Sequence, residues 1–107
     1  MEKSKAFTFI GFAIKARKVK MGVNAVATLR RAEMLIVCHS ASENTVKDAV
    51  SLSKKLGAKL FTLNEVNLSD VTFKDNCKLI AITDKALSEA ILKSDERFDG
   101  NFSRYTW

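Results

Sequence analysis

The chain has 107 residues, of which 47% are hydrophobic and 28% are charged, and its formal net charge at pH 7 is +6. This length allows one compact domain rather than two, and the hydrophobic fraction is enough for a core. No apolar run approaches the roughly 20 residues needed to cross a bilayer, and no cleavable signal pattern follows the amino terminus. We therefore expect a cytoplasmic protein with no membrane partner.

The positive charge is concentrated in one part of the chain. Residues 1–31 contain eight basic side chains and one acidic one, whereas residues 32–107 contain ten basic and eleven acidic side chains. The whole excess therefore belongs to the first third, which is the electrostatic pattern expected of a phosphate-binding face. The alternative interpretation is a solvated basic face without a partner.

The first third of the chain predicts two helices with a short extended piece between them. Apolar side chains recur at helical spacing over residues 4–16, so this segment is expected to be an amphipathic helix. A basic turn follows, with an extended piece at Val19, and Gly22 opens a second helix over residues 23–32. The continuous apolar run 34–38 is typical of a strand that is covered on both faces.

The next segment gives the clearest helix, whose apolar positions run from Val46 to Leu56. Its apolar positions keep the helical period, Ser42 or Asn44 can accept the free amide hydrogens of the first turn, and Gly57 ends it. Apolar runs then predict a second strand over 59–63 and a third strand over 78–82. Between these two strands we expect a short helix over 64–71, capped by Asn64.

The last helix is expected to begin after Thr83 or Asp84, either of which can cap it. We expect residues 1–93 to form one domain and the more polar residues 94–107 a loosely ordered tail whose aromatic residues could dock. Strands that are apolar on both faces alternate with helices along the chain. This pattern predicts a three-layer α/β/α sandwich around a mixed or largely parallel sheet.

Residues that could carry catalysis or hold a cofactor are sparse. His39 is the only histidine, and although Ser40 and Ser42 are close to it, no G-x-S-x-G elbow surrounds them. Cys38 and Cys77 lie in apolar runs, which does not match a zinc-ligand spacing and suits buried, reduced thiols. Neither glycine-rich nucleotide-binding pattern is present. We therefore expect no enzyme activity, no metal, no cofactor and no small-molecule substrate.

Several runs together resemble a known family. They are Phe9-Ile10-Gly11-Phe12-Ala13, Ala16-Arg17-Lys18-Val19, Gly22, the strand 34–38, the run 41–45 and the run 80–85. Their order and spacing resemble the kink-turn RNA-binding ribosomal protein family, of the archaeal L-seven-Ae type with its bacterial YlxQ-like relatives, over residues 5–93. The resemblance implies an α/β/α sandwich around a four-stranded sheet. It also implies a structured RNA partner, either a ribosomal RNA or another RNA with a kink-turn or related bend.

The resemblance extends to the start of the second helix, with two departures. Gly22 and Asn24 match the family's glycine and asparagine, but Ala25 stands where the family has a glutamate and Thr28 where it has a lysine. Ala25 cannot accept a hydrogen bond from a guanine edge, and a lost base-edge contact usually costs about 1–3 kcal/mol of discrimination. The resemblance therefore implies RNA binding without strict kink-turn specificity.

The expected RNA site is centred on the opening turn of the second helix. Backbone N–H groups of Gly22, Val23 and Asn24 would receive phosphate oxygens there, and Asn24 could instead be a plain helix cap. Thr28 lies one turn on, and His39 and Ser42 are expected to line the same edge. The cations expected to surround this turn and bind phosphates are Lys15, Arg17, Lys18, Lys20, Arg30 and Arg31.

A different functional class stays open. A protein–protein interaction module could have kept the fold after losing specific RNA readout. The substitutions at Ala25 and Thr28 favour this alternative, whereas the concentrated positive charge argues against it.

Overall fold

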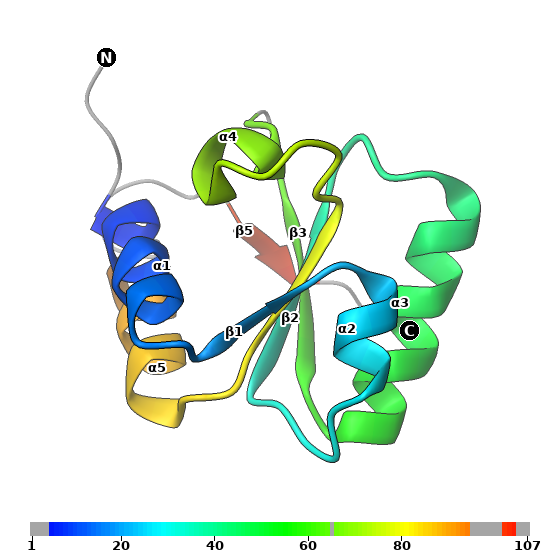
Figure 1. Ribbon diagram of the computed structural model, residues 1–107, viewed down its shortest axis with the longest axis horizontal. Coiled ribbons are helices and arrows are strands. Elements are labelled where there is room, and N and C mark those ends of the chain that lie inside the picture. The colour runs from blue at the N-terminus through cyan, green and yellow to red at the C-terminus, as the bar shows by residue number, and fades with distance from the viewer. Residues whose placement is uncertain (1–4, 65, 95–101, 105–107) are drawn as a thin grey trace.

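The computed structural model describes residues 5–64, 66–94 and 102–104 of the chain. These residues form helices and strands that alternate through most of the chain (Figure 1). The helices are α1 (Lys5–Lys15), α2 (Val23–Ala27), α3 (Glu43–Leu56), α4 (Leu68–Thr72) and α5 (Lys85–Ser94). The strands are β1 (Val19–Met21), β2 (Met34–Cys38), β3 (Lys59–Leu63), β4 (Leu79–Ile82) and β5 (Phe102–Arg104).

The strands make one mixed sheet in the order β1-β4-β2-β3-β5. The central strand β2 pairs in parallel with β3 and antiparallel with β4, while the outer pairs, β1 with β4 and β3 with β5, are antiparallel. The predicted α/β class with a mixed sheet is confirmed. The described sheet has five strands, however, where about four were expected.

The additional strand comes from the segment that was expected to be a loose tail. β5 pairs with the edge of β3, and the ring of Phe102 lies edge-on to that of Phe7 with 6.2 Å between centroids. Asn64 also donates a side-chain hydrogen bond to Ser103, at 2.7 Å. These long-range contacts order residues 102–104, so these three residues belong to the sheet, and Phe102 docks, which the sequence left open for the aromatic residues of this segment. The rest of that segment, 95–101 and 105–107, lies outside the described residues.

Helices cover both faces of the sheet, as Figure 1 shows. On one face, α1, α4 and α5 contribute buried side chains such as Ile10 and Ile91 to a core with alternate residues of the strands. On the other face, α2 and α3 contribute Val26 and Ala49 to a second core. β2 serves both cores, and all five of its residues are at most 2% exposed. This is the predicted three-layer arrangement.

Two helices differ from their predicted bounds. The second helix was expected to continue to residue 32, but α2 ends at Ala27, and Thr28 closes it with its N–H and its hydroxyl both donating to the Ala25 carbonyl, the hydroxyl at 2.6 Å. The short helix before β4 was expected after Asn64, but α4 begins at Leu68 because the Asn64 side chain is bonded to the fifth strand instead. α3 has its expected ends, since Ser42 caps it and Gly57 closes it with φ of 67°.

The sheet has two ends that matter for the site. We call one end of the sheet the upper end because α4 covers it at the top of Figure 1, although the start of α2 lies at mid-height in that view. At this end the Gly22 N–H donates to the Leu79 carbonyl and the His39 N–H to the Leu63 carbonyl. This end therefore joins the end of β1, the carboxyl ends of β2 and β3, and the start of β4. At the lower end, the Thr83 N–H donates to the Lys18 carbonyl, so the start of β1 meets the end of β4.

The central strand yields a test of the two-sided core. We expect Ile36→Ala to lower the free energy of unfolding by about 2–5 kcal/mol and Ile36→Val by about 0.5–1.5 kcal/mol, because the site is fully enclosed and leaves a cavity. Denaturant unfolding of both variants measures this, with the exposed substitution Ser51→Ala as the control. A loss below about 1 kcal/mol for Ile36→Ala would contradict the close packing around β2.

Candidate nucleic-acid interface

The start of α2 places Asn24 on the surface at the upper end. Gly22 follows the edge strand with φ of 89°, a left-handed conformation that glycine adopts without strain, and it occupies the cap position of α2. Asn24 lies inside the helix, so it is not the helix cap. Its side chain is exposed and makes no hydrogen bond within residues 5–64, 66–94 and 102–104. The amide is therefore free to contact a ligand.

One part of the expected phosphate seat is wrong. The Gly22 N–H is not free, because it donates to the Leu79 carbonyl at 2.7 Å and thereby continues the sheet past β1. α2 is also only five residues long, which leaves little helix dipole to attract an anion. Any contact of this turn with a ligand is therefore made by the Asn24 side chain and by the backbone of Val23 and Asn24.

The turn after β2 brings two polar side chains to the same end. His39 is exposed, and its Nδ1 lies 3.2 Å from the Leu63 carbonyl oxygen. A carbonyl oxygen only accepts, so Nδ1 is the donor in this bond, and in the neutral imidazole Nε2 is then an acceptor. Ser42 has a different role, because its hydroxyl caps α3 by accepting from the Thr45 N–H at 3.2 Å. His39 thus presents an acceptor at this end while Ser42 stabilises the local fold.

Beneath this turn lies the buried thiol of Cys38. Its Sγ is 3.2 Å from the Ser40 hydroxyl and accepts from the Leu68 N–H at 3.4 Å. Burial by itself raises the pKa of this thiol. The hydrogen bonds from Ser40 and Leu68, with the charge of Lys78, outweigh burial and bring the pKa of Cys38 below its ordinary value. The thiol therefore ties the β2–α3 turn to the start of α4.

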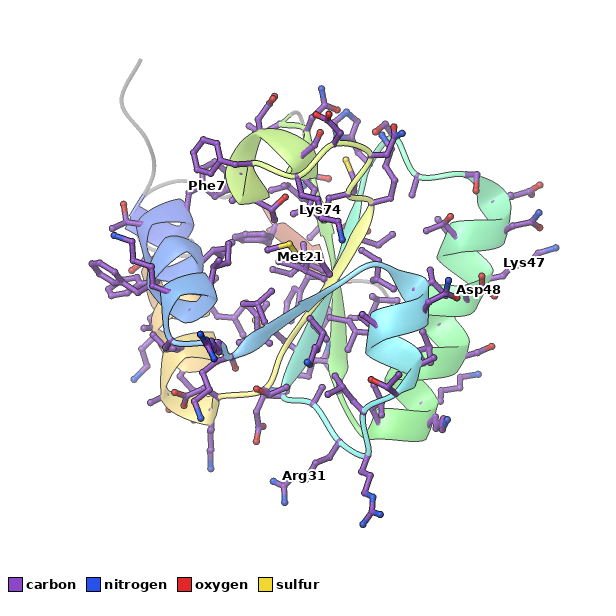
Figure 2. All side chains as sticks on the ribbon, in the orientation of Figure 1. Phe7, Met21, Arg31, Lys47, Asp48 and Lys74 are labelled. Carbon is purple, nitrogen blue, oxygen red and sulfur yellow. The ribbon has the colours of Figure 1, made fainter. Side chains whose placement is uncertain are left out.

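The loop from α4 to β4, residues 73–78, was missed by sequence reasoning. Phe73 ends α4 in a left-handed conformation and is 80% exposed, the largest exposure of any large hydrophobic side chain among the described residues. Lys78 donates to the Ser40 hydroxyl at 2.7 Å, and Figure 2 shows Lys74 in the same part of the view as Met21, the last residue of β1. The sequence signal for an exposed ring was Phe73 itself, a single phenylalanine followed by the polar residues 74–76.

The upper end is close to neutral. Its segments 22–24, 38–43, 66–70 and 73–78 contain two lysines against three carboxylates. This composition differs from the ring of cations expected around the start of α2, and it points to contacts of shape and hydrogen bonding rather than strong electrostatic attraction.

The expected cations lie elsewhere, so their predicted arrangement around the start of α2 is wrong. Arg17 and Lys18 precede β1, and Arg30 and Arg31 follow α2, which places all four at the lower end. Figure 2 shows Arg31 at the end of the molecule opposite Lys74. The physical reason is that α2 runs from the upper end to the lower end, so the residues after it return to the start of β2.

Of the remaining expected residues, Lys15 and Thr28 lie toward the lower end and Lys20 lies between the two ends. Lys15 is the last residue of α1, and Thr28 closes α2. Lys20 is in the middle of the edge strand, opposite Ala81, which belongs to the core beneath α2 and α3. Residues that are directly paired on neighbouring antiparallel strands point to the same face of the sheet, so the exposed Lys20 lies on the α2 side with Ala81.

The described residues contain no group of three or more histidine, cysteine, aspartate or glutamate side chains that could hold a metal ion. Among these residues, no helix is both long and apolar enough to cross a membrane. The candidate interface is therefore made of exposed polar, basic and aromatic side chains.

No protein-family model matches the chain, and no curated protein matches it. Among solved structures, the fold is similar to that of a protein with unknown function from Bacillus halodurans, with a TM-score of 0.71 and 19% sequence identity. The match covers 88% of this chain and 99% of that chain. At this identity the likeness supports the α/β/α fold alone.

The two roles considered for Ser42 can be separated by measurement. We expect Ser42→Ala to lower the free energy of unfolding by about 1 kcal/mol, because an amide hydrogen of the first turn of α3 loses its acceptor. Ser42→Asp should keep most of the stability, since aspartate is also a good cap. Thermal unfolding of both variants beside Ser51→Ala tests this, and equal stability of Ser42→Ala and the wild type would refute the capping role.

Proposed function

We propose that the chain is an RNA-binding protein of the kink-turn-binding type, without strict kink-turn selectivity, and that RNA binds at its upper end. The main support is that Asn24 and His39 come from two separate segments and are both exposed where β1 and β2 end. Sequence-specific proteins recognise the unstacked bases of RNA loops and bulges by aromatic stacking and hydrogen bonds to base edges. This set of side chains suits such bases.

Each group at the upper end has a distinct part in the proposal. The Asn24 side-chain amide can both donate and accept hydrogen bonds, so it can read a base edge. Nε2 of His39 can accept a hydrogen bond from a base or a ribose hydroxyl. Lys74 and Lys78 supply the phosphate contacts that fix the position of the RNA.

The weak kink-turn selectivity in the proposal follows from Ala25. Its methyl group occupies the position where the resemblance places a carboxylate, so a guanine edge would find no acceptor there. Bent RNAs should still bind better than straight duplexes, because their unstacked bases remain accessible to Asn24.

The first test concerns Asn24. We expect Asn24→Ala to weaken binding to a kink-turn RNA by about 1–3 kcal/mol, roughly 5- to 150-fold, because one base-edge contact is lost. Fluorescence anisotropy at raised salt measures this best, since salt weakens the electrostatic attraction to phosphates that every RNA shares. Ser51→Ala, on the outer side of α3, is the control. An unchanged affinity for Asn24→Ala would show that RNA does not contact the start of α2.

The second test restores the missing carboxylate. Ala25→Glu should raise the preference for a kink-turn RNA over an unkinked duplex by about 1–3 kcal/mol, since the new side chain can accept from a guanine. Ala27→Glu, in the same helix but outside its first turn, adds the same charge and should not change the preference. Competition between the two RNAs gives the measurement, and an equal preference in both variants would mean that α2 is not the reading element.

A protein–protein interaction module is the second candidate function. It is favoured by two exposed aromatic side chains, Phe73 and the 52% exposed Phe12, because large apolar side chains on a surface often mark contacts with partners. A titration against kink-turn RNA and unkinked duplex at two salt concentrations separates the candidates. Selective binding to the kink-turn supports the RNA proposal, and absence of any binding at low salt favours the interaction module.

A further inference from the structure

Four segments that are far apart in the sequence meet at the lower end of the sheet. The Glu33 N–H donates to the Ile82 carbonyl at 2.9 Å, and the Ala32 N–H donates to the Leu56 carbonyl at 3.4 Å. Together with the bond between Thr83 and Lys18, these contacts fix the lower end as one surface. We define the cationic end as the segments 17–18, 30–33, 54–59 and 83–85.

The cationic end holds the entire excess of positive charge. It contains eight lysines and arginines against two carboxylates, while the rest of the chain has ten basic and ten acidic residues. All eight cations are exposed. They are Arg17, Lys18, Arg30, Arg31, Lys54, Lys55, Lys59 and Lys85.

The two carboxylates at this end already have partners. Glu33 lies 3.6 Å from the Arg31 guanidinium, and Asp84 accepts from the Ala86 N–H at the start of α5. The Arg31 side chain is 85% exposed, so this ion pair does not remove it from solvent. Most of the positive charge at this end is therefore available to an external anion.

The cationic end is separated from the upper end by the length of α3. This helix begins after Ser42 at the upper end and reaches Leu56 at the lower end, and its 14 residues span about 20 Å. A surface at each end can therefore contact a different stretch of RNA. The nearly neutral upper end suits base contacts, whereas the cationic end suits phosphates irrespective of sequence.

We propose that the cationic end is a second RNA-binding surface that holds the phosphate backbone of a duplex, so that one protein joins two stretches of RNA. This inference rests on the proposed function, in which the upper end receives the first stretch. The exposed phenylalanines, Phe12 on α1 and Phe73 after α4, lie outside the four segments, so the surface lacks the apolar anchors of a membrane-binding face.

The first experiment measures how salt affects binding to an unkinked RNA duplex. We expect Arg30→Gln with Lys55→Gln to reduce the slope of log affinity against log salt by about two, because each phosphate contact contributes about one. Lys47→Gln with Lys93→Gln removes the same charge outside both surfaces and should leave the slope unchanged. Equal slopes for the two double variants would overturn the proposal, provided that both unfold like the wild type.

The second experiment detects joining of two RNAs. A kink-turn RNA is fixed to a surface, protein is added, and capture of a labelled duplex is recorded. The wild type should capture the duplex, while Arg30→Gln with Lys55→Gln should bind the fixed RNA within about twofold of wild type and capture several-fold less duplex. Undiminished capture by this variant would overturn the proposal, because the two RNAs would then be joined in another way, for example through a protein dimer.

Two further outcomes are distinguishable. If the wild type binds the duplex with the expected salt slope but does not prefer the kink-turn RNA, the proposed function of the upper end fails while the cationic end stands as an RNA-binding surface. If vesicles that contain anionic phospholipid compete the duplex away at equal phosphate concentration, and Arg30→Gln with Lys55→Gln loses the vesicles too, the cationic end is a membrane-binding surface and the inference is overturned.

Discussion

The structure depends on the burial of β2 between two helical layers. Its five residues alternate between the core under α1, α4 and α5 and the core under α2 and α3, so this strand holds both layers to the sheet. Because β3 runs parallel to β2 and β4 antiparallel to it, the carboxyl end of β2 lies beside that of β3 and the start of β4. The polar groups around His39 gather there for this reason.

The same constraint also places the positively charged residues at one end of the sheet. The chain enters β2 at the lower end, so the residues that precede it, including Arg30 and Arg31, remain there with the start of β1. It leaves β2 at the upper end, where α4 and its following loop close over Cys38. The molecule therefore has a nearly neutral end and a positively charged end, related by the direction of one strand rather than by any local sequence motif.

How far the sequence predicts this arrangement differs between elements. β2 and β3 were predicted to the residue, because a fully buried strand needs an uninterrupted apolar run. β5 was missed, since its three residues are ordered only by pairing with β3 and by contacts from Phe7 and Asn64. The sequence also located half of the cations of the cationic end near the front of the chain, but Lys54, Lys55, Lys59 and Lys85 join them only through folding. The position of charge is a tertiary property.

The two edge strands of the sheet are both short, which bears on self-association. β1 and β5 each have only three residues, and the exposed Lys20 and Arg104 lie on them. Unpaired strand edges are templates for joining one sheet to another, and short edges that carry charge make poor templates. Two copies of this protein are therefore poorly suited to join sheet edge to sheet edge, since like charges on facing edges repel before backbone groups meet.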